Sequence, residues 1–432
     1  MGRPTTPIAQ RPIPLELLAP AGGREQLEYA IRFGADAVYL ATERFGMRRR
    51  ATNFTMADLP DAVAYAHDHG VAVHLACNVV MHEHDLTELE NYLTTAQAAG
   101  VDALIVSDLG ALRLARTHAP AVDLHVSTQA SIANSQAALT WYELGARRVV
   151  CAREMSVAQI AAMRAQLPDD LEIEVFAHGS MCMAYAGRCM ISDYLTGRGA
   201  NDGNCTQPCR WAWSLHEPSR PGQEFAIEED EDATYLFNSR DLNMLEHLAD
   251  LANAGVTSIK LEGRGRGAFY AATVTGAYRR VLEGADPHLV ARELDTFSHH
   301  PYSTGFFYGP AHQAPASSAS EQRWLWVAEV LSCEARDDGL WEALVVARNR
   351  FDGSSHLEVV SPGECSRALG IAGIRWVHEN DEGTLVEEPT DVAGRQMERY
   401  RMVCDCELHA RDIVRAQVNV GNSDDAPDEQ GT

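Results

Sequence analysis

Four cysteines with the chemistry of metal ligands, Cys182, Cys189, Cys205 and Cys209, lie in one stretch rich in Gly, Asn and Asp. Thiolates bind zinc and iron–sulfur clusters well, and a loop with glycines can wrap around an ion. Structural zinc sites favour cysteine pairs separated by about two to four residues, and only Cys205 and Cys209 form such a pair. The spacing C-x6-C-x15-C-x3-C therefore favours an iron–sulfur cluster, with zinc and unliganded thiols as the alternatives.

A second group of candidate functional residues consists of polar residues that follow short apolar runs. They are Asn78, Ser107, Asp108, Ser127 to Gln129, Arg153, Glu154, His178, Lys260, Glu262 and Arg264. If the runs are parallel strands of a barrel, their carboxyl ends meet at the face that holds active sites. We expect His178, Lys260 and Glu262 to be catalytic, with His178 as a proton shuttle. A histidine hydrogen-bonded to the backbone is the alternative.

Three adjacent arginines, Arg48–Arg50, follow the second apolar run. A guanidinium can hold a carboxylate or a phosphate through two parallel hydrogen bonds. A solvated basic turn is the alternative. The residues that we expect to bind the substrate are Arg48, Arg50, Asn78, Gln129 and Arg264.

Lys260 is the only lysine among 36 basic side chains, and the others are all Arg. A compact ammonium can titrate or enter a small pocket, whereas a guanidinium can do neither. The lone lysine therefore indicates a position where Arg does not fit, with chance as the alternative.

The elements that must position these side chains alternate between short apolar runs and amphipathic stretches. The expected strands are Leu15–Leu18, Asp36–Leu40, Val71–Cys77, Asp102–Val106, Asp123–Val126, Arg148–Cys151, Glu172–Phe176 and Ser258–Leu261. The expected helices are Arg24–Phe33, Ala57–His69, Asp85–Ala99, Ala111–His118, Ser135–Leu144, Val157–Gln166, Leu242–Asn253 and Ala268–Leu282. Eight strand–helix units predict a (β/α)8 barrel of the TIM type. A doubly wound open sheet is the alternative, but no GxGxxG motif follows the first strand.

The domain organisation follows from breaks in this pattern. We expect a disordered N-terminus at 1–14, a barrel at 15–294 and a cysteine-rich insertion after the seventh strand at 179–215. Loops this long in a compact domain are usually functional. A linker at 295–322, rich in Pro, Gly, Ser and aromatic residues, precedes short alternating runs at 323–417, which predict a small all-β, barrel-like domain. The acidic tail at 418–432 reads as disordered.

Composition excludes several classes of function. The 432 residues carry a net charge of −25, which argues against wholesale non-specific nucleic-acid binding. We find neither a secretory signal nor a stretch apolar enough to span a bilayer, and so expect a cytoplasmic protein without structural disulfides. A GxSxG nucleophile elbow is lacking, and HEHD at 82–85 is not the HExxH zinc motif.

The segment EVFAHGSMCMAYAGRCMIS at 174–192 resembles the signature of the collagenase-like peptidase family U-32. LLAPAGG at 17–23, ADAVYL at 35–40, VSTQA at 126–130, NSRDL at 238–242 and IKLEGR at 259–264 are similar to further segments of that family. Many members carry a cysteine ligand at the position of Asn243, for which Cys209 is available instead. NCTQPCRW and EDEDATYLFNSRDL are similar to the tRNA-hydroxylating branch.

The resemblance implies an iron–sulfur enzyme that forms 5-hydroxyuridine at the wobble position of tRNA, with prephenate as a co-substrate. It implies a 4Fe–4S cluster held by the four cysteines named above. The partners would be tRNA and a small dicarboxylate metabolite, without a membrane. A collagenase-like peptidase, a relative that hydroxylates ribosomal RNA or a quinone, and a zinc-containing RNA-binding scaffold are the alternatives.

Overall fold

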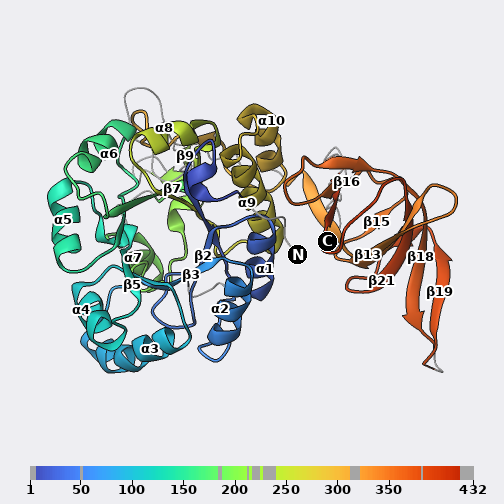
Figure 1. Ribbon diagram of the computed structural model, residues 1–432. Helices are drawn as coiled ribbons and strands as arrows, with labels where there is room; N and C mark the ends of the chain where they lie inside the picture. Colours follow the sequence, from blue (N-terminus) through green and yellow to red (C-terminus); the bar gives the residue numbers. More distant parts are fainter. Residues whose placement is uncertain are drawn as a thin grey trace. The chain divides into compact units, whose positions relative to one another are not determined.

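The computed structural model describes residues 6–48, 52–182, 187–211, 214–216, 224–226, 240–311, 322–380 and 383–418. The chain divides into two compact units. The first comprises residues 1–294 and 299–320, and the second comprises residues 295–298 and 321–432. Figure 1 labels the elements of both units.

Eight parallel strands form a closed barrel in the first unit, as the sequence predicts. They are β1 (Glu16–Pro20), β2 (Ala37–Leu40), β3 (Ala72–Cys77), β4 (Ala103–Val106), β5 (Asp123–Val126), β6 (Arg148–Val150), β7 (Glu172–Ser180) and β11 (Ser258–Leu261). Consecutive strands pair from β1 to β7, and β11 closes the ring by pairing with both β7 and β1. The carboxyl ends of all eight strands therefore open at one face.

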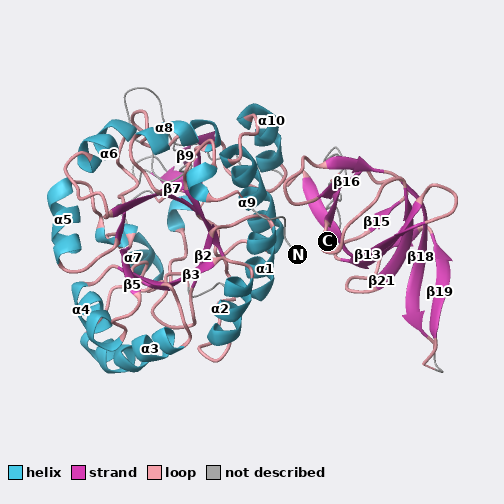
Figure 2. Ribbon diagram, viewed as in Figure 1, coloured by secondary structure: helices cyan, strands magenta, loops and turns pink. Residues whose placement is uncertain are grey.

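Helices surround this barrel, as Figure 2 shows in cyan. They are α1 (Arg24–Arg32), α2 (Leu59–Asp68), α3 (Leu86–Ala98), α4 (Leu109–His118), α5 (Ser135–Glu143), α6 (Val157–Arg164), α8 (Leu248–Asn253), α9 (Ala268–Leu282) and α10 (Pro287–Ala291). Local chemistry sets their ends. Asn134 and Ser156 cap α5 and α6 by accepting backbone hydrogen bonds. After α1, Gly34 takes a left-handed φ of 99° that ends the helix.

Ionic groups, rather than only branched apolar residues, fill part of the barrel interior. Arg148 of β6 is buried, and its guanidinium lies 2.6 Å from Glu16 of β1 and 3.0 Å from Glu174 of β7. Lys260 of β11 binds the same Glu174 at 3.1 Å. His74 is also buried, and its ring lies 4.7 Å from the ring of His125. The ion pairs therefore link β6, β7, β11 and β1, the sector where the barrel closes.

The structure corrects three expectations about the chain. Residues 242–243 belong to a strand, β10 (Asp241–Asn243), which pairs antiparallel with the extended end of β7, so the helix begins only at Leu248. Within the expected linker, β12 (Tyr302–Ser303) pairs with β10, and Phe307 is buried in the same unit. Sequence analysis did not predict these two features because neither segment contains a long run with periodic apolar residues.

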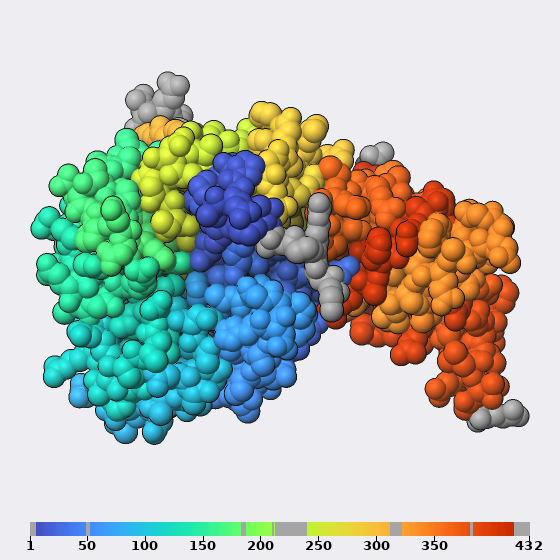
Figure 3. Space-filling view, in the orientation of Figure 1, coloured from blue at the N-terminus to red at the C-terminus, as the bar shows by residue number. Residues whose placement is uncertain are grey.

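The N-terminal segment is the third correction. Residues 6–14, expected to be disordered, pack against the barrel domain because Arg11 forms a buried ion pair with Asp36 at 2.6 Å. Figure 3 shows this segment in dark blue on the surface of that domain. Of the acidic tail expected at 418–432, residues 419–432 lie outside the described residues. In the part of the chain that is described, we find no helix with the length and apolarity needed to cross a bilayer.

The second unit is an antiparallel β domain, as predicted. Its sheet follows the order β17 (Arg367–Leu369), β16 (Leu357–Val360), β22 (Ile413–Gln417), β13 (Trp324–Ala335), β14 (Trp341–Ala347), β21 (Arg399–Cys404), β18 (Ile371–Glu379) and β19 (Leu385–Thr390). A second pair joins β15 (Phe351–Asp352) to β20 (Val392–Ala393). The apolar faces of the long strands form the core. Among the described residues β17 and β19 do not pair, so the sheet is open.

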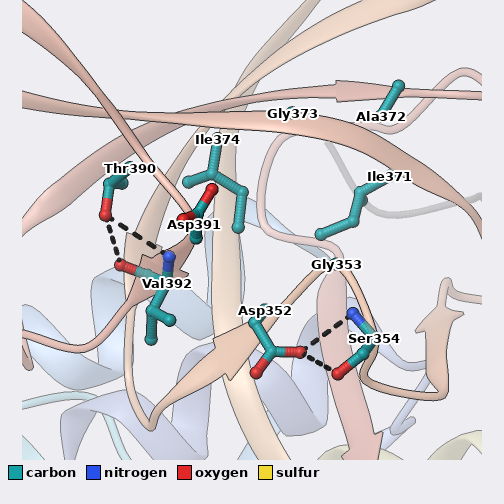
Figure 4. Close-up of a pocket in the computed structure, with 10 residues that line it drawn as sticks. All are labelled: Asp352, Gly353, Ser354, Ile371, Ala372, Gly373, Ile374, Thr390, Asp391 and Val392. Atoms are coloured by element: carbon teal, nitrogen blue, oxygen red, sulfur yellow. Dashed lines mark hydrogen bonds between the residues drawn. The ribbon is translucent and has the colours of Figure 1, made fainter.

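A pocket of about 380 Å³ lies in this β domain, and Figure 4 shows its lining. Its floor is apolar, with Ile371, Ile374 and Val392. Asp352 accepts hydrogen bonds from the backbone and hydroxyl of Ser354 at 2.9 and 2.6 Å, and these bonds lower the pKa of its carboxyl group. No cation, histidine or cysteine is among the residues that line it, so it lacks the groups that the predicted chemistry needs.

The buried histidines predict how stability depends on pH. Burial lowers the pKa of His74 from 6.5 to about 4. Between these values the unfolded chain binds a proton that the folded chain does not, so the free energy of unfolding decreases as pH falls from 6.5 to 4. For His74 this loss is on the order of 3 kcal/mol.

Urea unfolding at several pH values checks this. His74→Gln should reduce the acid sensitivity of the barrel, whereas His84→Gln, at a side chain 80% exposed, should leave it unchanged. Equal pH slopes for wild type and His74→Gln would show that His74 is not the neutral buried group described.

Candidate functional site

A pocket of about 60 Å³ opens at the carboxyl ends of the barrel strands. Its lining comprises Tyr39, Met47, Arg48, Ala76, Asn78, Ile105, Ser127, Thr128, Gln129, Val150, Arg153, Phe176, Lys260, Glu262 and Arg264. The structure thus brings together six residues expected from the sequence to act at the site: Arg48, Asn78, Gln129, Lys260, Glu262 and Arg264. Arg50 lies outside the described residues.

The walls of the pocket carry an excess of positive charge. Arg48, Arg153, Lys260 and Arg264 line it, against the single carboxylate of Glu262. Arg48 binds Glu262 at 3.1 Å. Burial acts to raise the pKa of Glu262, but the surrounding arginines outweigh it and lower that pKa, so the carboxylate stays ionised. In a chain of net charge −25, this is a local concentration of positive charge, which is the electrostatic setting that favours an anion.

Two arginines of the pocket have buried N–H donors without a hydrogen-bond partner in the described part of the structure. These donors are the Nη1 atom of Arg264 and the Nε atom of Arg153. Burial lowers the pKa of Arg264 to about 10, which still leaves it charged at neutral pH. Arg153 is held in place because its Nη1 donates to Ser180 O at 2.7 Å and its guanidinium stacks 3.8 Å from the Phe176 ring. Buried donors without partners are expected where a ligand completes the site.

Lys260 lies at the base of the pocket, between the ionic interior of the barrel and the ligand space. Its side chain is 6% exposed, and its Nζ is 3.1 Å from Glu174 and 4.4 Å from the centre of the Tyr39 ring. Burial lowers its pKa, and the nearby Glu174 opposes that shift. The Tyr39 hydroxyl donates to Leu261 O at 2.9 Å, which fixes the ring against β11.

The loop after β2 is held so that Arg48 faces the pocket. The Asn78 amide oxygen accepts from Met47 N at 3.2 Å, and its Nδ2 donates to Ser127 Oγ at 3.1 Å. Arg48 itself has a left-handed φ of 73°. Asn78 therefore acts mainly as a brace between the ends of three strands.

His178 does not line the pocket. Its ring is buried, with Nδ1 3.3 Å from the Tyr278 hydroxyl, and that hydroxyl donates to Ala177 O at 2.8 Å. Burial lowers the pKa of His178 to about 3, so the ring stays neutral at physiological pH. This environment suits a residue that positions the end of β7, and it leaves the predicted proton-shuttle role without direct access to the ligand space.

The cysteine-rich insertion packs against the mouth of this pocket. Gly203 has a φ of 77°, and a Cβ there would lie 2.9 Å from Gly46 O. Gly187 has a φ of 75°, and its Cβ would lie 2.5 Å from Gln129 O. Asn201 O accepts from Val80 N at 3.2 Å. These close approaches bring the loop to the strand ends that carry Arg48 and Gln129.

All four predicted ligand cysteines are described, with Cys182 exposed and the other three partly buried. A tetrahedral zinc site with Zn–S bonds of about 2.3 Å needs sulfur atoms about 3.8 Å apart. Among the described residues no three of these sulfurs lie within 4.8 Å of one another. A multi-iron cluster binds each sulfur at a different iron and so needs wider separation. The sulfurs therefore do not form a tetrahedral zinc site, and four thiols on one insertion are the kind of donors that a cluster uses.

Local structure also supports these cysteines as ligands. Cys205 Sγ accepts a hydrogen bond from Gln207 N at 3.3 Å, and Ser192 Oγ accepts from Thr206 N at 3.0 Å, which ties helix α7 (Ile191–Thr196) to the second cysteine pair. Negative charge on the Cys182 or Cys205 sulfur would favour the charged form of Arg48, which already has a raised pKa, chiefly because of Glu262. The insertion therefore presents thiols toward the cationic side of the pocket.

A second set of potential ligands lies inside the barrel, where ligand atoms of His74, His125 and Glu174 are within 4.8 Å of one another. Glu174 already binds Arg148 and Lys260. Two cations at this distance repel a metal dication, so we assign the set to the ionic core.

Sequence reasoning missed Tyr39 and Phe176, which line the pocket between the charged groups. Both are aromatic residues close to strand ends. Alternation along each strand could have found them, because Tyr39 of β2 shares the interior of the barrel with Leu18 and Ile105.

The fold and the pocket define the chain as a β/α-barrel protein with a cationic ligand site at the carboxyl ends of its strands and a cysteine-rich insertion at the mouth. It belongs to peptidase family U32, whose sequence profile matches residues 22–316.

Curated relatives of this chain have different names. The tRNA hydroxylation protein P1 of Bacillus subtilis is 37% identical over 395 residues, covering 89% of this chain and 92% of that protein. The tRNA hydroxylation protein P of Escherichia coli is 32% identical over 80% of this chain and 86% of that protein. A collagenase of Porphyromonas gingivalis is 34% identical over 62% of this chain and 65% of that protein.

The open donors predict that Arg264 binds an anion. Arg264→Gln should weaken the binding of malonate, a simple dicarboxylate, about ten- to a hundredfold in Kd, because a hydrogen bond to a charged group contributes about 1.5–3 kcal/mol. Isothermal titration calorimetry measures the change. Arg113→Gln removes an exposed arginine on α4 and serves as the control. Equal affinity in the two variants would remove Arg264 from the site.

Proposed function

We propose that this protein hydroxylates a uridine of tRNA at the wobble position to form 5-hydroxyuridine, with a 4Fe–4S cluster and prephenate as co-substrate. Relatives named tRNA hydroxylation proteins, aligned over most of both chains, support the substrate. The observation that carries the proposal is the cationic pocket beside the docked insertion with its four cysteines.

In this proposal Cys182, Cys189, Cys205 and Cys209 hold the cluster, which supplies one-electron redox chemistry at the mouth of the barrel. The hydrogen bond from Gln207 N to Cys205 Sγ is of the kind that tunes the potential of such a centre.

The protein's own groups do the binding and orienting. Prephenate is a dicarboxylate, and the free donors of Arg153 and Arg264 match its two negative groups. Arg48 is turned toward the pocket by its ion pair with Glu262. Glu262 stays ionised beside the ligand space and holds Arg48 there, and Lys260 can donate a proton to the ligand.

The RNA partner fits the site through a single nucleotide. Anticodon bases are already unpaired, so one uridine can enter the mouth without the cost of opening a duplex. The chain's net charge of −25 makes broad contact with phosphates unfavourable.

A peptidase is the alternative suggested by the name of the collagenase relative. It would need a base close to a nucleophile, and Ser180 has His178 as its neighbour. Because burial lowers the pKa of His178 to about 3, this histidine is a weak base for that purpose. The environment of His178 therefore favours the hydroxylase.

Anaerobic purification tests the proposal. Wild-type protein should be brown and contain about four iron and four sulfide ions per chain. Cys205→Ala should lose most of the iron, whereas Cys365→Ala, which removes an exposed thiol of the β domain, should keep it. In cells that lack the gene, tRNA nucleoside analysis should show 5-hydroxyuridine restored by wild type and by Cys365→Ala only.

The outcomes separate the alternatives. Colourless protein with one zinc would replace the redox centre by a structural metal. Unchanged tRNA nucleosides in the deletion strain, together with a loss of hydroxylated ribosomal RNA or quinone, would move the substrate to those classes.

A further inference from the structure

Lys260 occupies a position that its role as a cation does not explain. Its Nζ and the guanidinium of Arg148 bind the same carboxylate, Glu174, at 3.1 and 3.0 Å. An arginine thus performs one of these two contacts, and arginine is the basic residue everywhere else in the chain. What lysine alone offers here is a primary amine, which becomes a nucleophile once it loses its proton.

The amine of Lys260 has the surroundings that a nucleophile needs. The side chain lines the pocket, so a ligand can reach it. Its Nζ lies within hydrogen-bond distance of Glu174, and it sits over the Tyr39 ring. Arg148, Glu262, His74 and His125 are the other titratable groups that act on this buried region. Burial lowers the pKa of Lys260, which increases the fraction of free amine.

The other residues of the pocket determine which class of ligand can be held next to the Lys260 amine. The free donors of Arg264 and Arg153 bind a carboxylate. A ligand held there presents the atoms next to its carboxylate to the same small space that Lys260 lines. We propose that Lys260 forms an imine with the carbonyl carbon of a 2-oxo carboxylate bound in this pocket. This deepens the proposed function, on which it rests for the co-substrate, because prephenate contains a 2-oxo acid group.

The step balances without an oxidant or a reductant. Lys260 releases its proton to solvent, its nitrogen lone pair adds to the carbonyl carbon, and a proton moves from nitrogen to oxygen to form a carbinolamine. The hydroxyl group of the carbinolamine then takes a proton from solvent and leaves as water. The carbon–nitrogen double bond replaces the carbon–oxygen double bond, and the carboxylate stays on the arginines throughout. An imine makes the adjacent carbons easier to deprotonate, which activates the ligand for further chemistry.

Borohydride trapping tests this on the whole protein. The protein is incubated with pyruvate, reduced, digested and analysed by mass spectrometry. A reduced imine adds the mass of the ligand less one oxygen atom. Because the chain has a single lysine, an adduct can form only at Lys260 or at the terminal amine, and peptide mapping separates the two. We expect labelling of Lys260 that saturates with pyruvate and exceeds that of the terminal amine at least tenfold.

Matched controls define the reaction. Lactate keeps the carboxylate but lacks the carbonyl, so it should give no adduct and should compete with pyruvate. Lys260→Arg retains the cation beside Glu174 and should abolish labelling while the thermal unfolding temperature stays close to that of wild type. Arg264→Gln leaves the amine in place and should lower labelling about tenfold at subsaturating pyruvate.

Each outcome of the trapping experiment tests the imine proposal independently of tRNA modification. Absence of a Lys260 adduct in folded wild-type protein would overturn the proposal, as would labelling that Arg264→Gln leaves unchanged at every pyruvate concentration. The hydroxylase assignment is tested separately by nucleoside analysis, so a Lys260 adduct in a protein that does not modify tRNA would sustain the imine and reject the hydroxylase.

Discussion

The rest of the structure depends on the two ion pairs that the buried carboxylate of Glu174 forms with Arg148 and Lys260. A buried charge is tolerated only when it is paired, and removing one partner of such a pair costs about 3–5 kcal/mol. Arg148 extends the network to Glu16, so β1, β6, β7 and β11 are joined through ions as well as through backbone hydrogen bonds. This is the sector where the barrel closes, and the register there places Lys260 at the base of the pocket.

Charge pairing also explains why the pocket is cationic while the chain is acidic. Glu174 satisfies Lys260 from the barrel side, and Glu262 satisfies Arg48 from the mouth. Arg153 and Arg264 keep buried donors without partners in the described structure. Glu174 and Glu262 thus fix the cationic side chains in place without neutralising the positive charge of the pocket. The unpaired donors of Arg153 and Arg264 are then available to a ligand. The cysteine insertion docks on the same side, through glycines that allow close backbone contact with the strand-end loops.

The sequence predicted the barrel well because parallel strands buried on both faces and helix-terminating glycines are local signals. Six pocket residues were also predictable, since polar residues after apolar strands converge once the barrel closes. The roles of His178 and Asn78 were not, because both depend on partners distant in the chain, Tyr278 for one and Met47 with Ser127 for the other. Strand β10 and the ordered residues 299–311 escaped prediction for a similar reason, since β10 pairs with the extended end of β7, β12 pairs with β10, and neither strand has a period of its own.

The reason why the chain has a lysine only at position 260 can be judged only from the structure. In the sequence, Lys260 indicates a place where arginine does not fit, and either size or chemistry could be the reason. In the structure, Arg148 reaches the same carboxylate from a side chain only 5% exposed, so burial beside Glu174 does not by itself exclude a guanidinium. The difference between the two positions is that Lys260 lines the ligand pocket and Arg148 does not. Access to a ligand, rather than pairing or packing, is therefore the property that distinguishes the one amine that this chain retains.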